Sequence, residues 1–102
     1  MTPDSRPDPA LEVQHQADAQ RFVVTTPQGL ALCSYRLDPG ARGDVLVLHH
    51  TEVPAALEGR GIAAALVAAA LTWARSQGLR VQPLCSYVAA YMRRHPETLD
   101  LL

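Results

Sequence analysis

Residues 58–63 have the composition of a phosphate-binding turn. Gly59 and Gly61 flank Arg60 where a strand pattern gives way to a long alanine-rich segment. Glycines allow a tight bend and a close approach of the backbone to an anion, and the first N–H groups of a helix carry the positive end of its dipole. Arg60 would add a charge-assisted contact to a phosphate. The alternative is that the glycines only make the turn while Arg60 points into water, and a lone Gly-x-Gly does not decide between the two.

Cys85 stands where a short strand pattern ends and a helix pattern begins. The N-terminus of a helix favours a thiolate over a thiol, which makes a cysteine reactive. Free cysteine is also among the most buried residue types, so a packing role is the alternative. The sequence therefore marks Cys85 as a candidate catalytic or pocket-lining residue.

His50 and Glu52 are two residues apart on one face of a predicted strand. Either side chain could accept the proton of an ammonium group, although a buried histidine beside a carboxylate can equally be a structural pair. His49 points to the opposite face from His50, so the two cannot bind one metal ion together. Since no cluster of cysteine and histidine occurs elsewhere, we expect no metal site.

The elements that must position these residues predict an α+β fold. A period of two indicates strands, a period of 3.6 with many alanines indicates the first helix, and Gly78 and Pro96 are helix stops. The expected strands cover residues 11–15, 21–25, 30–37, 44–53 and 79–85, and the expected helices cover residues 61–77 and 86–95. This order favours a single mixed, mostly antiparallel sheet whose C-terminal half reads strand, helix, strand, helix. Unbroken alternation over residues 44–53 would place Val47 and Thr51 on one face and Leu48 and His50 on the other.

Length and composition limit the function classes. The 102 residues suffice for one domain, expected at residues 11–102 after a flexible, proline-containing tail at residues 1–10. A net charge of −1 argues against binding to nucleic acid. All nine basic residues are arginines, which excludes chemistry that depends on a lysine. Without an export signal, a membrane-spanning run or a disulfide framework, we expect a cytoplasmic protein that does not bind membranes.

The turn resembles the pyrophosphate motif of the GNAT superfamily of N-acetyltransferases, Gln/Arg-x-x-Gly-x-Gly/Ala. The corresponding segment here is Glu58-Gly59-Arg60-Gly61-Ile62-Ala63, in which Gly61 and Ala63 match the two fixed small positions. Glu58 departs from the motif, because a glutamine or arginine is usual there and a carboxylate opposes a nearby phosphate. The resemblance implies that acetyl-CoA is the co-substrate and that its pyrophosphate lies at this turn.

Flanking segments are similar to the small, single-domain YjdJ-like branch of that superfamily. They are His50-Thr51-Glu52-Val53 before the motif, and Pro83-Leu84-Cys85-Ser86-Tyr87-Val88-Ala89-Ala90-Tyr91 with Arg93-Arg94-His95-Pro96 after it. The resemblance implies a trimmed fold with an open acceptor side, since only a few turn residues separate the second and third strands. It also implies that the strand before the motif separates from the next parallel strand and that the pantetheine arm lies in the gap. Arg93, Arg94 and His95 most simply complement the helix dipole.

The resemblance extends to site residues. Tyr91 is spaced like the superfamily tyrosine that protonates the departing thiolate, with Tyr87 one turn earlier as its rival. The residues expected to bind acetyl-CoA are Thr51, Val53, Glu58, Gly59, Arg60, Gly61, Ile62 and Ala63. Those expected to be catalytic are Cys85, Tyr91, His50 and Glu52.

The expected function is transfer of an acetyl group from acetyl-CoA to an amine. An amine loses its proton and attacks the thioester carbonyl, and an acid returns a proton to the sulfur. The alternatives are a non-catalytic acyl-CoA-binding or protein-interaction module and a purely structural domain. The acceptor is a small-molecule or protein amine that no residue specifies, and the sequence leaves open whether the chain forms a homo-oligomer.

Overall fold

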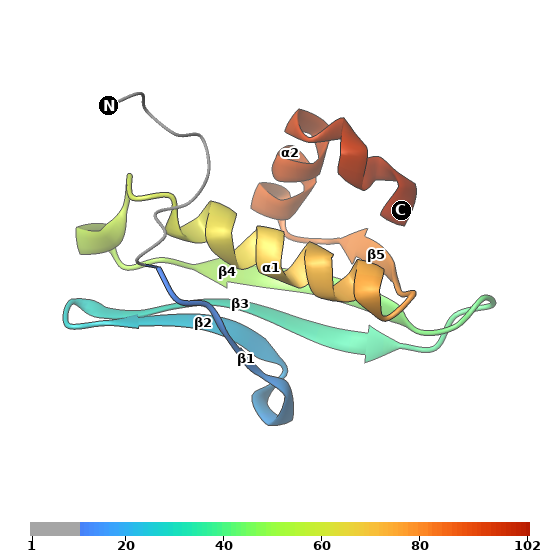
Figure 1. The fold of residues 1–102 in the computed structure, drawn as a ribbon, viewed down its shortest axis with the longest axis horizontal. Coiled ribbons are helices and arrows are strands. Elements are labelled where there is room, and N and C mark those ends of the chain that lie inside the picture. The colour runs from blue at the N-terminus through green and yellow to red at the C-terminus, as the bar shows by residue number, and fades with distance from the viewer. Residues whose placement is uncertain (1–10) are drawn as a thin grey trace.

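One mixed sheet of five strands organises the chain, in the order β1-β2-β3-β4-β5 (Figure 1). The computed structural model describes residues 11–102, so the tail expected at residues 1–10 lies outside the described residues. The first four strands pair antiparallel with their neighbours, and β4 and β5 pair parallel. The α+β prediction with a single, mostly antiparallel sheet is confirmed.

Four strands overlap their predicted segments closely, whereas the first is shorter than predicted and covers only two residues of the expected range 11–15. They are β1 (Gln14–Gln16), β2 (Arg21–Thr26), β3 (Gly29–Asp38), β4 (Val45–Glu52) and β5 (Arg80–Pro83). A short 3-10 turn, Ala17–Ala19, joins the first two strands and was not predicted. Pro83 ends β5 at the outer edge of the sheet, where its missing N–H costs no ladder hydrogen bond.

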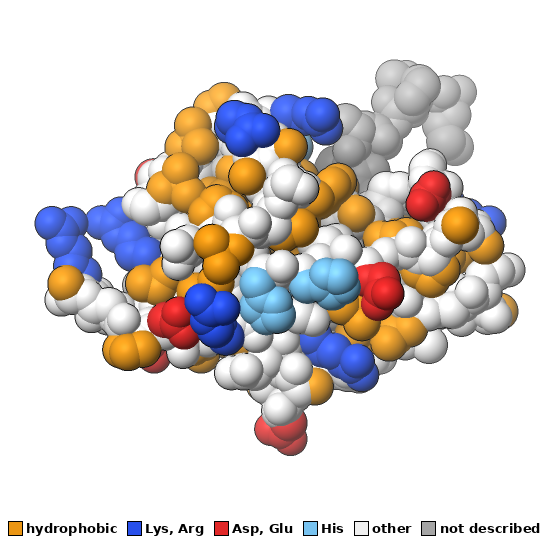
Figure 2. All heavy atoms as spheres, turned by 180° about the vertical axis from the view of Figure 1, so that it is seen from behind, with side chains coloured by type: hydrophobic (Ala, Val, Ile, Leu, Met, Phe, Trp, Pro, Cys, Tyr) orange, Lys and Arg blue, Asp and Glu red, His pale blue; other side chains and the backbone are white. Residues whose placement is uncertain are grey.

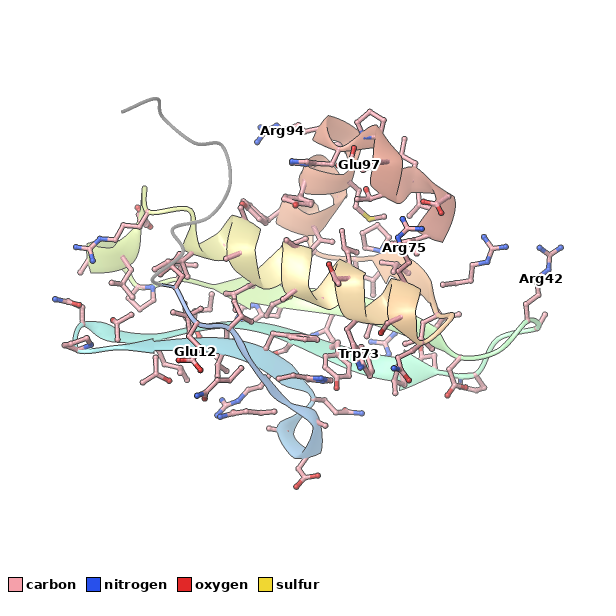
Figure 3. The ribbon with its side chains drawn as sticks, in the orientation of Figure 1. Glu12, Arg42, Trp73, Arg75, Arg94 and Glu97 are labelled. Carbon is pink, nitrogen blue, oxygen red and sulfur yellow. The ribbon has the colours of Figure 1, made fainter. Side chains whose placement is uncertain are left out.

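Helix α1 (Ile62–Ser76) lies across one face of the sheet (Figure 1). Its apolar stripe packs on the core-facing side chains of the strands, and Leu66, Val67 and Ala70 are fully buried. Trp73 lies against the aromatic rings of the first three strands, with its ring centroid 4.6 Å from that of His15 (Figure 3). The predicted helix at residues 61–77 is confirmed to within one residue at each end.

Helix α2 (Ser86–Arg94) follows β5 and packs beside α1. Pro96 ends α2 as expected, but the chain then continues as a 3-10 helix, Pro96–Leu101, that the sequence did not predict. Leu101 is buried, and Arg75 of α1 binds the Asp100 carboxylate at 2.8 Å, so the C-terminal segment is tied to α1. Within the described part of the chain, no helix has the length and apolar character needed to span a membrane.

Strand β4 contains a bulge that changes which side chains face α1. Ser34 of β3 pairs with His50, and the next residue, Tyr35, pairs with Leu48, so that His49 has no partner in β3. An extra residue in one strand reverses the alternation beyond it. The prediction of unbroken alternation over residues 44–53 is therefore wrong: Leu48 and Thr51 face the core together.

Candidate active site

Strands β4 and β5 separate before β4 ends. Their pairing runs from Val45 with Arg80 to Leu48 with Pro83, whereas β4 continues to Glu52. The carbonyl oxygen of Leu48 accepts hydrogen bonds from the N–H groups of both Leu84 and Cys85, each at 3.0 Å. Beyond this point β4 has no β5 partner, which opens a gap whose edge consists of the backbone of residues 49–52.

The turn before α1 has the backbone shape that its glycines predict. Gly59 and Gly61 have φ angles of 81° and 75°, a left-handed conformation that only glycine adopts without strain. A pocket of about 310 Å³ opens on this turn. Its lining consists of Val53, Leu57, Glu58, Gly59, Gly61, Ile62, Ala63, Ala64 and Tyr87.

The first turn of α1 presents backbone donors to this pocket. The N–H of Ala65 donates to the carbonyl oxygen of Gly61 at 3.0 Å, which is the first hydrogen bond within the helix. The N–H groups of Ile62, Ala63 and Ala64 precede it and have no partner within the helix. Together with the dipole they favour an anion in this pocket. Arg60 is exposed and does not belong to the lining, whereas Glu58 does.

Cys85 immediately precedes α2 and lies at the start of the gap. Its thiol donates to Thr51 Oγ1 at 3.5 Å, and the hydroxyl of Thr51 donates to Cys33 Sγ at 3.8 Å. Thr51 comes from β4 and Cys33 from β3, where the two residues are direct strand partners. Thr51, which was expected at the acetyl-CoA site, thus lies between two thiols.

The two thiols differ in acidity. Burial would raise the pKa of Cys85, but hydrogen bonds from the Thr51 hydroxyl and from the backbone N–H groups of Val88, Tyr87 and Thr51 outweigh it and lower the pKa. Burial, together with the nearby charge of an ionised Cys85, raises the pKa of Cys33 to about 11 despite the opposing hydrogen bond from Thr51. Cys85 is therefore the thiol that ionises.

His50 and Glu52 lie on the other face of β4. Their β3 partners are Ser34 and Leu32, so the two side chains share a face, as expected, but point away from α1. Both side chains are exposed. Figure 2, which views the molecule from the side opposite to Figure 1, shows histidine side chains next to each other on that surface, beside an acidic side chain. The structure does not bring His50 and Glu52 to the same face as Cys85.

Comparison with known proteins agrees with this arrangement. Residues 21–101 match the family model described as GCN5-related N-acetyl-transferase. The chain belongs to this acetyltransferase family. It is also similar to the protein NATD1 of Gallus gallus and of Mus musculus, each 40% identical over 90 residues that cover 84% of this chain and 77% of the relative. Protein NATD1 of Xenopus tropicalis is 41% identical over 90 residues, covering 88% of this chain and 82% of its own length.

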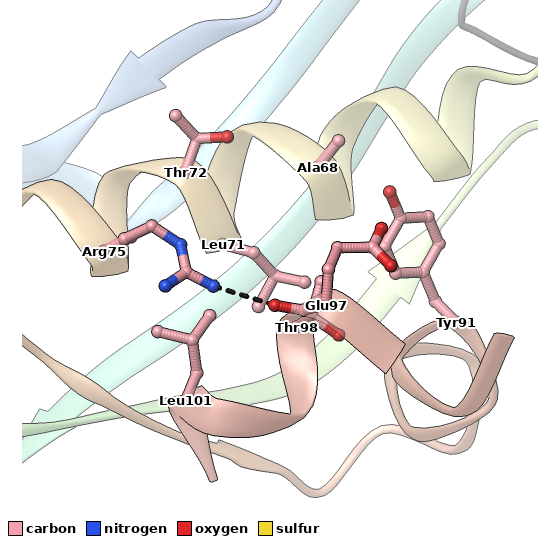
Figure 4. Close-up of a pocket in the computed structure, with 8 residues that line it drawn as sticks. All are labelled: Ala68, Leu71, Thr72, Arg75, Tyr91, Glu97, Thr98 and Leu101. Atoms are coloured by element: carbon pink, nitrogen blue, oxygen red, sulfur yellow. Dashed lines mark hydrogen bonds between the residues drawn. The ribbon is translucent and has the colours of Figure 1, made fainter. Parts of the chain in front are cut away.

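The two tyrosines that the GCN5-related resemblance singled out lie in different pockets. Tyr87 lines the pocket at the turn, beside Gly61 and Ile62. Tyr91 lines a second pocket of about 250 Å³ between α1, α2 and the C-terminal segment (Figure 4). The sequence spacing favoured Tyr91 as the acid, whereas the structure brings Tyr87 to the turn.

The second pocket combines a carboxylate, a phenol and an ion pair. Burial raises the pKa of Tyr91, and the charge of Glu97 raises it further. The Tyr91 ring stacks on His95, with ring centroids 4.0 Å apart. Arg75 is held there by Asp100 and by the carbonyl oxygen of Glu97. Sequence reasoning missed this pocket, because its residues come from segments whose contact no local pattern marks.

Sequence reasoning also missed Cys33. It gave this residue no role, because strand partners across a sheet are not visible without the register. Cys33 and Thr51 each lie in a β-forming segment. Knowledge of the antiparallel register between these segments would have shown that the two residues are neighbours.

Proposed function

We propose that this chain transfers an acetyl group from acetyl-CoA to an amine. The observation that carries the proposal is the position of Cys85, which the Leu48 carbonyl holds at the start of the gap between β4 and β5. The glycine turn at the beginning of α1 supplies a second, separate binding element for the same elongated co-substrate. Membership of the acetyltransferase family supports this assignment.

The turn fits a pyrophosphate. Gly59 has open space where a side chain would begin, so an anion can approach the backbone closely. Ile62 and Ala63 line the pocket, and their N–H groups, which have no partner within the helix, are available as donors. Glu58 belongs to the same lining, and its negative charge weakens this attraction.

The separated part of β4 fits the pantetheine arm. Residues 49–52 have backbone N–H and C=O groups on the side from which β5 has withdrawn, and amide groups of a ligand would pair with them as a strand does. Val53, half-buried at the end of this stretch, lines the pocket at the turn. The co-substrate would thus extend from the turn past Val53 and along residues 49–52 toward Cys85.

The residues around the gap supply the proton transfers. Acetyl-CoA provides the thioester carbonyl that the neutral amine attacks. On the face away from α1, His50 or Glu52 accepts the proton that the ammonium group loses. When the sulfur of CoA leaves, the Cys85 thiol donates its proton to it. Hydrogen bonds to Cys85 Sγ then stabilise the negative charge that remains on this residue.

A binding and turnover experiment tests the proposal. Isothermal titration of the purified chain with acetyl-CoA and CoA should show binding, whereas ATP and NAD should bind much more weakly. Turnover should then be followed with a panel of small amines and peptides, with released CoA measured by chromatography, because a thiol reagent would also react with Cys85. Absence of CoA binding by a folded protein would refute the proposal.

One observation favours an alternative function, a module that binds acyl-CoA without turnover. Glu58 lies in the pocket lining, so the site tolerates a charge that opposes a phosphate. Binding of acetyl-CoA without release of CoA in the presence of every amine tested would support this alternative.

A further inference from the structure

Three side chains at the site are joined by hydrogen bonds that run from the start of α2 to β4 and on to β3. This chain of side chains begins at Cys85 Sγ, passes through Thr51 Oγ1 at 3.5 Å, and ends at Cys33 Sγ, 3.8 Å from that hydroxyl. The three residues come from three different parts of the fold: the start of α2, β4 and β3. Cys33 is fully buried, whereas Cys85 is only half-buried and reaches the gap.

We propose that Thr51 and Cys33 are positioning residues that stabilise Cys85 as a thiolate. Thr51 would donate its hydroxyl proton to Cys85 Sγ, and Cys33 would donate its own thiol proton to Thr51 Oγ1. This inference rests on the proposed role of Cys85 in proton transfer, but it concerns the free protein and is testable without acetyl-CoA.

The proposal requires only that two hydrogens rotate. While Cys85 is protonated, its S–H donates to Thr51 and the Thr51 O–H donates to Cys33. When Cys85 loses its proton to the leaving sulfur, the Thr51 O–H turns toward the Cys85 thiolate and the Cys33 S–H turns toward Thr51 Oγ1. The three side chains lose one proton in total. The remaining hydrogens of Thr51 and Cys33 then each have an acceptor.

Cys33 suits the inner end of this chain because it keeps its proton. Burial raises the pKa of its thiol to about 11, so Cys33 remains a donor at every pH at which Cys85 titrates. The charge of an ionised Cys85 contributes to this rise in pKa, so Cys33 keeps its proton when Cys85 becomes a thiolate. A residue without a hydrogen-bonding group at this position would leave the lone pair of Thr51 Oγ1 without a donor.

Other titratable groups lie on the elements around the chain of side chains. On β3 they are Tyr35, Arg36 and Asp38, on β4 they are His49, His50 and Glu52, and on α2 they are Tyr87, Tyr91, Arg93 and Arg94. The side chains of His50 and Glu52 flank Thr51 and therefore point to the other face, and the hydroxyl of Tyr35 is bonded to His15 at 2.6 Å. Arg94 is the charged group that acts on Tyr87.

The backbone contributes to the same stabilisation independently of Thr51's hydroxyl. Backbone groups of Val88, Tyr87 and Thr51 also lower the pKa of Cys85, and a change of side chain at position 51 leaves these groups in place. Removing the Thr51 hydroxyl therefore measures how much this one group contributes to stabilising the Cys85 thiolate. Valine is the matched replacement, because it has the same shape as threonine and lacks only the hydroxyl.

The experiment measures the pH midpoint for alkylation of Cys85 by iodoacetamide, followed by mass spectrometry of the peptide that contains it. Thr51→Val should raise this midpoint by about one pH unit, because the hydrogen bond to the charged form is lost. Thr51→Ser retains the hydroxyl and should keep the midpoint near that of the unchanged protein. Cys33→Ala should shift it in the same direction as Thr51→Val but by less.

The possible results distinguish the role of Thr51 and Cys33 from the proposed acetyl transfer. A Thr51→Val protein that is folded, as judged by circular dichroism, and has an unchanged midpoint would overturn the role of Thr51. An unchanged midpoint in Cys33→Ala would overturn the role of Cys33. Failure of acetyl-CoA to bind would refute the proposed function and leave the alkylation result standing, because that measurement uses the protein alone.

Discussion

The backbone N–H of Cys85 donates to the carbonyl oxygen of Leu48 at 3.0 Å, and this bond fixes the cysteine at the point where β4 and β5 part. Leu48 is also the last β4 residue paired with β5. Cys85 therefore does not depend on a mobile loop for its position. It is held by the same carbonyl that ends the parallel ladder, with its thiol turned toward Thr51.

Cys85→Ala should lower turnover and leave CoA binding intact. Loss of an acid at the leaving sulfur costs about 100-fold in kcat, whereas the turn and the backbone of β4 still hold the co-substrate. Single-turnover kinetics and isothermal titration check the two parts. In the unchanged protein mixed with acetyl-CoA and no acceptor, mass spectrometry should find no rapid stoichiometric acetylation of Cys85. A fast acetyl-Cys85 that an amine discharges would make this cysteine the nucleophile.

Gly61→Asp should reduce CoA affinity strongly. The new side chain introduces a negative charge where the phosphate is expected, and Gly61 has a left-handed φ of 75°. Gly61→Asn is the matched control, since asparagine has nearly the same shape, tolerates this conformation and is neutral. We expect the aspartate variant to bind CoA about tenfold more weakly than the asparagine variant. Equal affinities of the two folded variants would argue against a phosphate at this turn.

The turn and α1 could be predicted because the signals are local. A glycine turn, a run of alanines and a period of 3.6 all act within a few residues, so the sequence alone places the start of the helix at Gly61, one residue before the observed start at Ile62. The fold class followed from the order of such segments. Tertiary packing did not need to be known for these predictions.

The bulge at His49 could not be predicted, because it depends on the register between β3 and β4. The run from Val45 to Glu52 alternates equally well with or without an extra residue, and only the pairing of Tyr35 with Leu48 reveals it. The same register brings Cys33 to Thr51. The pocket around Tyr91 escaped prediction for a related reason: the pairing of Arg75 with Asp100 bridges segments that have no local connection.

Glu58→Gln should bind CoA more tightly than the unchanged protein. Glu58 lines the pocket at the turn, and removal of its charge relieves repulsion from the phosphates. Because Glu58 is exposed, solvent screens the interaction, and the expected gain is about two- to fivefold at low salt, with less at high salt. Titration at two salt concentrations measures both effects. Weaker binding by the variant would reveal a direct role for the carboxylate.

Tyr87→Phe should affect catalysis more than Tyr91→Phe. The two substitutions are matched, since each removes one hydroxyl from α2, but only Tyr87 lines the pocket at the turn. We expect kcat/KM to fall by about tenfold for Tyr87→Phe and to stay within about twofold for Tyr91→Phe. The reverse order would contradict a role for Tyr87 at the turn and would point instead to Tyr91, which the family spacing favoured.

His15 links the edge strand β1 to the rest of the fold. Its ring stacks on Phe22 with centroids 4.2 Å apart, and its Nε2 lies 2.6 Å from the Tyr35 hydroxyl. Desolvation lowers the pKa of His15 below its ordinary value of 6.5. Protonation therefore favours the unfolded chain, in which the imidazole is fully hydrated.

The resulting prediction concerns stability against pH. Because the pKa of His15 is lower in the folded state, its stabilising contribution is complete above the unfolded pKa of 6.5 and is lost as the pH falls through the folded pKa. The Tm should therefore fall as the pH is lowered from about 7.5 to about 5. His15→Gln cannot titrate but still offers Tyr35 a hydrogen-bond acceptor, so its Tm should fall less over the same interval. Thermal denaturation of both proteins across this range measures the difference, which removes the contributions of other titrating groups. Parallel curves for the two proteins would show that His15 titrates alike in the folded and unfolded chain.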